Sequence, residues 1–408
     1  MATAAQLDPE TRSRLTFNRD RVRGACAGLV ETGVFTFGLV IAIRCFDAPP
    51  SVKALLSGAN SIGLLLTPIS LFVFARAGWN AAGAASMNFG VGGVCFAIAA
   101  FATSLGLYVP AAALGSIFIA QQAPLLIHIY TQNYAPTSRG RMLSNSIVLG
   151  LIASVAFAII GGRLLDWRLE TFRIILGAMA VASWIAALAT SGMPADPFRP
   201  GRNANPFSAM RYAWEDRIFG WMLFVWMLMG WGNLMVLPLR VEYMANPRFG
   251  INATNAQIAL VSGIIPSLVR IASTHFWGRL FDRHNFFVIR TVLNGVFLLA
   301  ILTFFSTRDL LVLGIGAGLF GFAVAGSNIA WNLWVTKFAP ADRTSDYMSV
   351  HTFLTGFRGV AAPFVGFWLI AHTTPLITAL CAGVLIALSM VLLGPLRRQH
   401  AAPGSAKL

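Results

Sequence analysis

Long apolar runs recur along this sequence, and they restrict what the chain can fold into more than any other feature. Each of the twelve runs is long enough, at roughly 20 residues, to cross a lipid bilayer as an α-helix. They cover residues 22–46, 52–75, 81–104, 107–133, 143–165, 171–192, 217–239, 255–277, 286–306, 309–336, 347–371 and 374–395. Because a backbone in lipid must satisfy its own polar groups, such runs predict helices. We therefore expect an all-α membrane protein with twelve transmembrane helices.

The composition excludes several classes of soluble protein. The chain is 57% hydrophobic and only 11% charged, whereas ordinary globular domains are about 25% charged. A cytosolic enzyme of 408 residues needs more charge to cover its surface. The net charge of +15 resembles that of a nucleic-acid binder, but the basic residues occupy short gaps between apolar runs, which is the pattern of a membrane protein. We expect no nucleic-acid partner.

Cysteines and enzyme motifs give no sign of a cofactor. Four cysteines are scattered inside apolar runs without a C-x-x-C pair, namely Cys26, Cys45, Cys95 and Cys381. This arrangement predicts neither a disulfide framework nor a metal site. The sequence also lacks a Walker phosphate-binding loop and the common hydrolase and dinucleotide motifs. We expect a protein that is not an enzyme and uses no cofactor.

The distribution of positive charge predicts an orientation. If the runs cross the membrane alternately, 20 of the 30 Lys and Arg residues fall on one side and eight on the other. The remaining two, Arg270 and Arg358, lie inside predicted helices. Since cytoplasmic loops carry an excess of Lys and Arg, both termini are predicted to be cytoplasmic. Abundant Arg, Ala and Gly suggest GC-rich coding DNA, and hence a bacterial inner (cell) membrane.

A hydrophilic gap divides the twelve runs into six and six. Residues 194–216 contain four prolines and predict a cytoplasmic linker rather than a thirteenth span. Within it, residues 206–216 have the composition of a short interfacial helix. The expected organisation is a cytoplasmic N-terminal tail (1–20), a six-helix bundle (21–193), the linker (194–216), a second six-helix bundle (217–396) and a cytoplasmic tail (397–408).

An internal repeat relates the two halves. Residues 133–139 (Asn-Tyr-Ala-Pro-Thr-Ser-Arg) match residues 337–343 (Lys-Phe-Ala-Pro-Ala-Asp-Arg), and the same shift in numbering brings Gly162 onto Gly366. Duplicated groups of six helices are typical of transporters that work by alternating access. The repeat therefore predicts two pseudo-symmetric bundles.

The most specific motif follows the eighth run. Residues 278–283 (Gly-Arg-Leu-Phe-Asp-Arg) are similar to the cytoplasmic G-x-x-x-D-R-x-G-R/K signature of the major facilitator superfamily. Asn285 and Phe286 stand where that signature ends in glycine and a basic residue. With the topology, the linker and the repeat, the resemblance covers nearly the whole chain.

Further traces of family motifs occur in the first half. The copy after the second run keeps Arg76 and Gly78 but has Ala75 in place of the acid. Residues 139–141 (Arg-Gly-Arg) begin the fifth predicted helix, which ends in Gly161-Gly162 without the proline of the family's antiporter signature. The direction of transport is therefore not indicated.

The resemblance implies two six-helix bundles that rock about a central cavity. It implies that the first, fourth, seventh and tenth helices line this cavity and that the second, fifth, eighth and eleventh lie between the halves. The residues that it assigns to a conformational lock are Arg76, Gly78, Gly278, Asp282, Arg283, Arg139 and Arg343.

Charges inside the predicted helices are the sharpest indication of function. Glu31, Arg270 and Arg358 lie near helix midpoints, where a charge costs about 2.5–3.5 kcal/mol on insertion scales. In one interpretation, Glu31 neutralises one arginine while the other binds an anionic substrate. In a second, Glu31 takes up and releases a proton during transport. A third alternative is a structural ion pair; which arginine would pair with Glu31 stays open.

Polar and aromatic side chains mark further candidates along the same pathway. His351 shares a helix face with Arg358 and is a candidate proton relay, or simply a hydrogen-bonding neighbour. Gln121 belongs to a polar stripe that either binds substrate or joins helices. The remaining candidates lie on the seventh and tenth predicted helices. Trp226 and Trp331 suit a large apolar or aromatic solute, or else ordinary aromatic packing. Asn233 and Asn328 are polar candidates on the same two helices.

These observations predict a secondary transporter. We expect it to move a small organic solute, anionic or amphiphilic, by alternating access and with proton coupling. The alternatives are a facilitative uniporter and a non-transporting receptor or scaffold of the same fold. The expected partners are the solute, the proton and the lipid bilayer, and the expected state is a monomer. The sequence leaves the solute and the coupling ion open.

Overall fold

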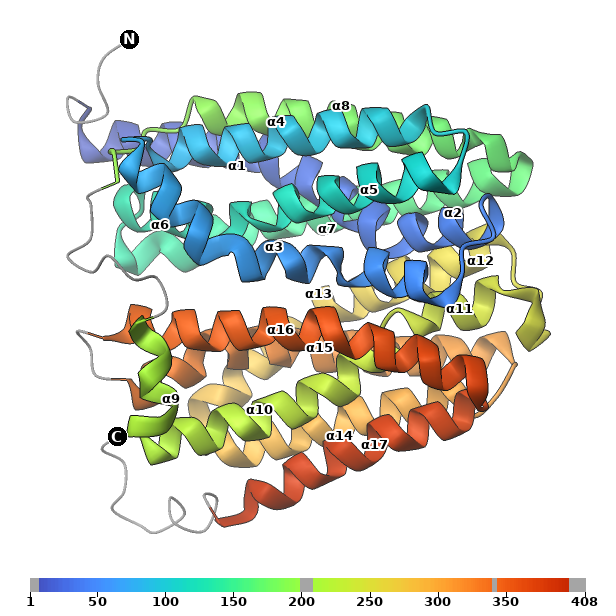
Figure 1. Ribbon diagram of the computed structural model, residues 1–408. Helices are drawn as coiled ribbons and strands as arrows, with labels where there is room; N and C mark the ends of the chain where they lie inside the picture. The colour runs from blue at the N-terminus through green and yellow to red at the C-terminus, as the bar shows by residue number, and fades with distance from the viewer. Residues whose placement is uncertain (1–6, 199–207, 340–342, 396–408) are drawn as a thin grey trace. The chain divides into compact units, whose positions relative to one another are not determined.

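A computed structural model describes residues 7–198, 208–339 and 343–395 of the chain. Over these residues the chain is built from helices joined by short turns, and twelve spans are long and apolar enough to cross a membrane (Figure 1). This confirms the predicted fold class. By its internal contacts the chain divides into two units, which are described separately.

Unit 1 comprises Met1–Ala48 and Ala59–Pro206 and carries the first six spans, apart from the start of the second. The first span is continuous through α1, a π-helical turn and α2. The helices are α1 (Pro9–Thr32), the π-helical turn (Gly33–Phe37), α2 (Gly38–Arg44), α3 (Pro50–Arg76), α4 (Ala81–Ala100), α5 (Leu105–Ala120), α6 (Gln122–Asn133), α7 (Pro136–Trp167), a 3₁₀ turn (Leu169–Thr171) and α8 (Phe172–Ser191).

Unit 2 comprises Pro49–Gly58 and Phe207–Leu408 and carries the other six spans. A second π-helical turn interrupts its second span. The helices are a 3₁₀ turn (Ser208–Arg211), α9 (Tyr212–Glu215), α10 (Arg217–Val236), α11 (Leu239–Ala245), a 3₁₀ turn (Pro247–Phe249), α12 (Asn255–Ala259), the π-helical turn (Leu260–Ile264), α13 (Ile265–Arg283), α14 (Phe286–Phe305), α15 (Leu310–Phe338), α16 (Thr344–His372) and α17 (Pro375–Leu392).

The two units repeat the same packing scheme. In unit 1, α1 packs on α7 and α8, and α4 packs on α5 and α8. In unit 2, the corresponding spans pack in the same pairs, since α10 contacts α16 and α17, and α14 contacts α15 and α17. The duplication seen in the sequence is therefore also a duplication of helix contacts.

The first span begins earlier than the hydropathy suggests. α1 starts at Pro9 rather than at residue 22, so most of the segment predicted as a tail is helical. The Asp8 side chain accepts a hydrogen bond from the Thr11 amide, Pro9 occupies the first turn, and Glu10 adds an acid there. All three features favour a helix start.

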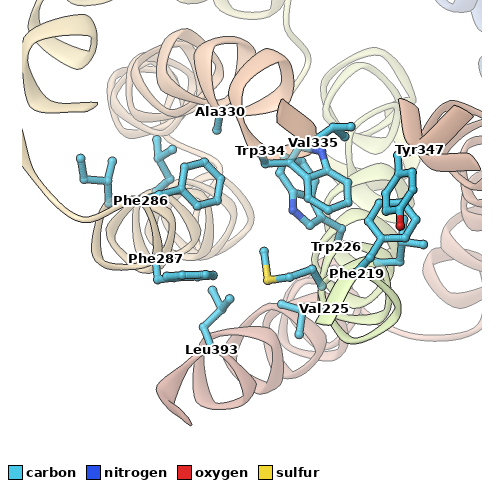
Figure 2. Close-up of a cluster of buried hydrophobic side chains, with 14 of the residues drawn as sticks. Phe219, Val225, Trp226, Phe286, Phe287, Ala330, Trp334, Val335, Tyr347 and Leu393 are labelled. Atoms are coloured by element: carbon cyan, nitrogen blue, oxygen red, sulfur yellow. The ribbon is translucent and has the colours of Figure 1, made fainter. Parts of the chain in front are cut away.

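A core cluster in unit 2 is rich in aromatic side chains (Figure 2). Trp226 of α10 stacks on Trp334 of α15, with ring centroids 5.5 Å apart. Phe219 lies against both Trp334 and Tyr347, with centroids at 5.5 and 4.4 Å. The candidate site lies against this cluster.

Candidate functional site

Arg358 is held inside unit 2 by α10. Its side chain lies on the α16 face toward α10, is 5% exposed, and donates a hydrogen bond through Nη1 to the Trp226 carbonyl oxygen. A Cβ atom at Gly230 would overlap the guanidinium, so this glycine makes room for the charge. Arg358 is therefore a buried charge, as its position within an apolar helix predicts.

His351 lies on the same helix face and is enclosed by indole rings. It is 1% exposed, and its ring centroid lies 4.0 Å from Trp331, 4.8 Å from Trp334 and 5.1 Å from Trp226. Its Nε2 atom has no hydrogen-bond partner within the described part of the chain. The structure thus brings four of the predicted site residues into one cluster. They are His351, Arg358, Trp226 and Trp331.

Arg290 is a member of this cluster that the sequence analysis missed. It stands in the second turn of α14, is 2% exposed, and places its Cζ atom 3.7 Å from the ring centroid of Trp226. Its charge lies close enough to act on both Arg358 and His351. In the count of basic residues Arg290 belongs to the more basic, cytoplasmic side, whereas in the structure it is buried against Trp226.

The charges described in this cluster are positive. Among the described residues, neither Arg290 nor Arg358 forms a salt bridge, and the pairs in unit 2 are Lys53–Glu242 and Arg211–Glu215. Both arginines therefore keep a positive charge in a core of indole rings. Removing an ion from water costs several kcal/mol unless a partner compensates for it, so this arrangement favours the approach of an anion.

The other predicted pathway residues lie in several places. In unit 1, Glu31 is exposed on α1 next to the π-helical turn, and Gln121 is buried where α5 gives way to α6. In unit 2, Arg270 is half-buried on α13, Asn233 half-buried on α10, and Asn328 exposed on α15. Since Glu31 and the two predicted arginines belong to different units, their pairing stays a prediction.

Most predicted lock residues of unit 1 are exposed at helix ends. Arg76 ends α3, with its Cζ atom 5.6 Å from the Phe72 ring centroid, and Gly78 has a φ of +70°, which glycine adopts without strain. Arg139 donates through Nη2 to the carbonyl oxygens of Thr131 and Tyr134, at 3.5 and 3.3 Å. Arg139 therefore caps the C-terminal end of α6.

The lock residues of unit 2 lie around the end of α13 and the start of α16. Gly278 has open space where a Cβ would stand, and Arg283 is exposed in the last turn of α13. Arg343 is exposed, with its Cζ atom 5.8 Å from the Tyr212 ring centroid. The side chain of Asp282 and residues 340–342 of the repeat lie outside the described part of the structure.

Unit 1 contains a buried ion pair that the sequence analysis did not predict. Asp20 is fully buried and accepts hydrogen bonds from Arg23 Nε and from the Tyr130 hydroxyl, each at 2.6 Å. Nearby, Asn133 donates to Thr16 Oγ1 at 2.9 Å and to the Pro194 carbonyl at 2.6 Å. This network ties α1 to α6, and its acid neutralises its own arginine.

A second buried pair lies in unit 2. Lys53 Nζ, in the first turns of α3, is 2.5 Å from Glu242 Oε1 of α11, and Asn246 donates to the same oxygen at 2.8 Å. Both charged side chains are at most 6% exposed. Within the described residues, no group of three His, Cys, Asp or Glu side chains gathers as a metal site.

Comparisons with known proteins agree on the fold. The sequence profile of the Major Facilitator Superfamily matches residues 83–363, and no curated protein matches the chain. A point mutant of the nucleoside transporter NupG is similar, with a TM-score of 0.77, 12% identity, and coverage of 93% of this chain and 99% of that one.

Two further solved structures show the same architecture. A D-xylose–proton symporter is 12% identical, with a TM-score of 0.67 over 93% of this chain and 96% of its own. The human organic anion transporter MFSD10 is 15% identical, with a TM-score of 0.65 over 95% of this chain and all of its own (100%). At these identities the similarity concerns the fold alone.

Proposed function

Because the chain belongs to the Major Facilitator Superfamily, we propose that it is a secondary active transporter that moves a small organic solute by alternating access. The fold is that of a transporter and the chain is a multi-pass membrane protein. The observation that carries the choice of solute is the pair of buried guanidinium groups, Arg290 and Arg358, around Trp226. It supports an anionic or amphiphilic solute.

Proton coupling through Glu31 is the second part of this proposal. Glu31 is an exposed carboxylate on a transmembrane helix, two residues before the start of a π-helical turn. Such turns are rare and often occur at functional sites. A carboxylate there can exchange a proton with water when the pathway opens, and the proton gradient then supplies the energy. The D-xylose–proton symporter shows that this fold accommodates such coupling.

The test is transport in liposomes that contain a pH-sensitive dye. Glu31→Gln is expected to abolish accumulation driven by a proton gradient while solute exchange continues, because the amide cannot release a proton. Glu10→Gln, on the exposed first turn of the same helix, serves as the matched control and is expected to behave like the wild type. Unchanged accumulation in Glu31→Gln would remove Glu31 from the mechanism.

Two alternatives give different results in the same assay. A facilitative uniporter equilibrates solute without moving protons. A receptor or scaffold of this fold produces no flux for any compound in a solute library.

The proposed membrane is a bacterial inner membrane, with both termini in the cytoplasm and the protein working as a monomer. The proposed partners are the solute, the proton and lipid.

A further inference from the structure

Building on the proposed transport function, we propose that the interior of unit 2 binds the carboxylate of the solute between Arg290 and Arg358. The site is formed by side chains of four helices, α10, α14, α15 and α16. The solute class that it selects is a small organic carboxylate with a flat, apolar body. Three features of the cluster carry this assignment.

The first feature is a set of buried donors without acceptors. Among the residues that the structure describes, hydrogen-bond partners are absent at Arg290 Nη1 and Nη2, at Arg358 Nε and at Trp226 Nε1. Buried polar groups in proteins are nearly always hydrogen-bonded. Guanidinium and indole N–H groups can only donate, so whatever completes this site must be an acceptor. A carboxylate offers two oxygens to such a pair of guanidinium groups.

The second feature is the missing countercharge. In unit 1 the buried Arg23 has Asp20 as its built-in partner, at 2.6 Å. In unit 2, the salt bridges of the described residues engage Glu242 with Lys53 and Glu215 with Arg211, and neither reaches Arg290 or Arg358. A bound anion therefore supplies in unit 2 what an aspartate supplies in unit 1.

The third feature is the aromatic surround. The guanidinium of Arg290 lies on the face of Trp226, and the His351 ring lies 4.0 Å from Trp331. Trp331 is only half-buried, while Trp226 and His351 are nearly inaccessible. Trp331 is thus the partly exposed member of the cluster, and its indole offers a flat surface to the body of the solute. Benzoate has both the charge and the shape.

The experiment measures ligand-induced stabilisation of the purified full-length protein in nanodiscs, without any gradient. The melting temperature is followed against sodium benzoate, sodium chloride and the neutral isostere benzamide, with constant ionic strength from a bulky sulfonate salt. A ligand that binds only the folded protein raises the melting temperature in a saturable manner. Benzoate is expected to do so, and chloride and benzamide are not.

Variants assign the effect to the two arginines. Arg290→Gln and Arg358→Gln are each expected to raise the half-saturating benzoate concentration about tenfold or more, since each removes charge-assisted hydrogen bonds. Arg217→Gln, which removes an exposed arginine at the start of α10, is the control and should keep the wild-type response. If a Gln variant does not fold, Arg290→Lys keeps the charge but loses the paired donors, and weaker binding is again expected.

The outcomes separate this inference from the proposed function. No saturable response to benzoate in the wild type, or an equal response in Arg290→Gln and Arg358→Gln, overturns the site while a transporter of neutral solutes stands. An equal response to chloride overturns the assignment to an organic carboxylate. Benzoate binding that depends on both arginines supports the site, and if liposomes then show no flux, the transport proposal fails and the binding site remains.

Discussion

Glu242 is the residue whose loss we expect to cost unit 2 the most stability. Its carboxylate holds the buried Lys53 ammonium at 2.5 Å. Glu242→Gln leaves this ammonium buried without a countercharge, which typically costs about 3–5 kcal/mol. The expected result is a large fall in melting temperature in detergent at neutral pH.

Two controls distinguish a buried pair from a surface pair. Glu215→Gln breaks the exposed Arg211–Glu215 pair, whose atoms are 3.9 Å apart, and should change stability by less than about 1 kcal/mol. The double variant Lys53→Met with Glu242→Leu removes both charges and should recover most of the loss. Equal melting temperatures for Glu242→Gln and Glu215→Gln would show that the buried pair contributes no more than the exposed one.

The burial of individual charged side chains could be predicted from the sequence in some cases and not in others. Arg358 stands in the middle of an apolar helix, so its burial was predictable from its neighbours. Arg290 stands four residues after the start of α14, where hydropathy does not distinguish a flanking arginine from a buried one. Its burial depends on Trp226, a residue of another helix, and only the packing shows it. The pair of Asp20 and Arg23 was hidden among tail charges for the same reason.

Small residues fix the spacing of α1 and α7 in unit 1. Gly24 and Gly28 lie one turn apart on α1, opposite Ser146 and Gly150 of α7, and a Cβ at Gly24 would lie 2.6 Å from the Ser146 carbonyl oxygen. Transmembrane helices often approach closely along such stripes. Gly28→Ala places a methyl group against the Gly150 backbone and is expected to destabilise the protein by about 1–3 kcal/mol.

The control variant for this prediction is expected to stabilise the protein rather than destabilise it. Gly177 lies within α8 with nothing within 4 Å of the position of a Cβ. Gly177→Ala gains helix propensity without a clash and should stabilise the protein by up to about 1 kcal/mol. Thermal unfolding in one detergent measures both variants. A Gly28→Ala protein at least as stable as Gly177→Ala would contradict the close approach of α1 and α7.

Helix boundaries were partly readable from local chemistry. Asp8, Pro9 and Glu10 form a helix start that the hydropathy analysis overlooked. The break between α5 and α6 at Gln121 comes shortly before Pro124, whose missing N–H group interrupts the backbone ladder. The π-helical turn at Leu260–Ile264 has a similar signal in Pro266, which lacks the N–H group that would bond within that turn. The π-helical turn at Gly33–Phe37 has no proline in it or directly after it.

At the scale of the whole chain, the repeat was the most informative feature of the sequence. It predicted two groups of six helices, and the structure adds that corresponding helices pack in the same pairs in both units. The sequence did not show that the units differ in their charge chemistry. Unit 1 neutralises its buried arginine with Asp20, whereas neither Arg290 nor Arg358 has a salt bridge with a described residue of unit 2.

The orientation of the chain in the membrane is a prediction for the whole molecule. Twenty Lys and Arg residues against eight place the turn at Ala77 in the cytoplasm and the turn at Ser306 on the opposite side. Both positions are exposed helix ends. In a variant lacking Cys26, Cys45, Cys95 and Cys381, single cysteines are introduced as Ala77→Cys and Ser306→Cys.

A membrane-impermeant maleimide added to intact cells is expected to label Ser306→Cys at once and Ala77→Cys only after permeabilisation. The reason is that moving the loops of the more basic side across the membrane is disfavoured during insertion. The reverse order of labelling would invert the topology and place both termini outside. Seven of the twelve spans lie between these two turns, which puts them on opposite sides of the membrane. Labelling of both cysteines in intact cells would mean that an even number of spans separates Ala77 from Ser306, and would contradict the predicted topology.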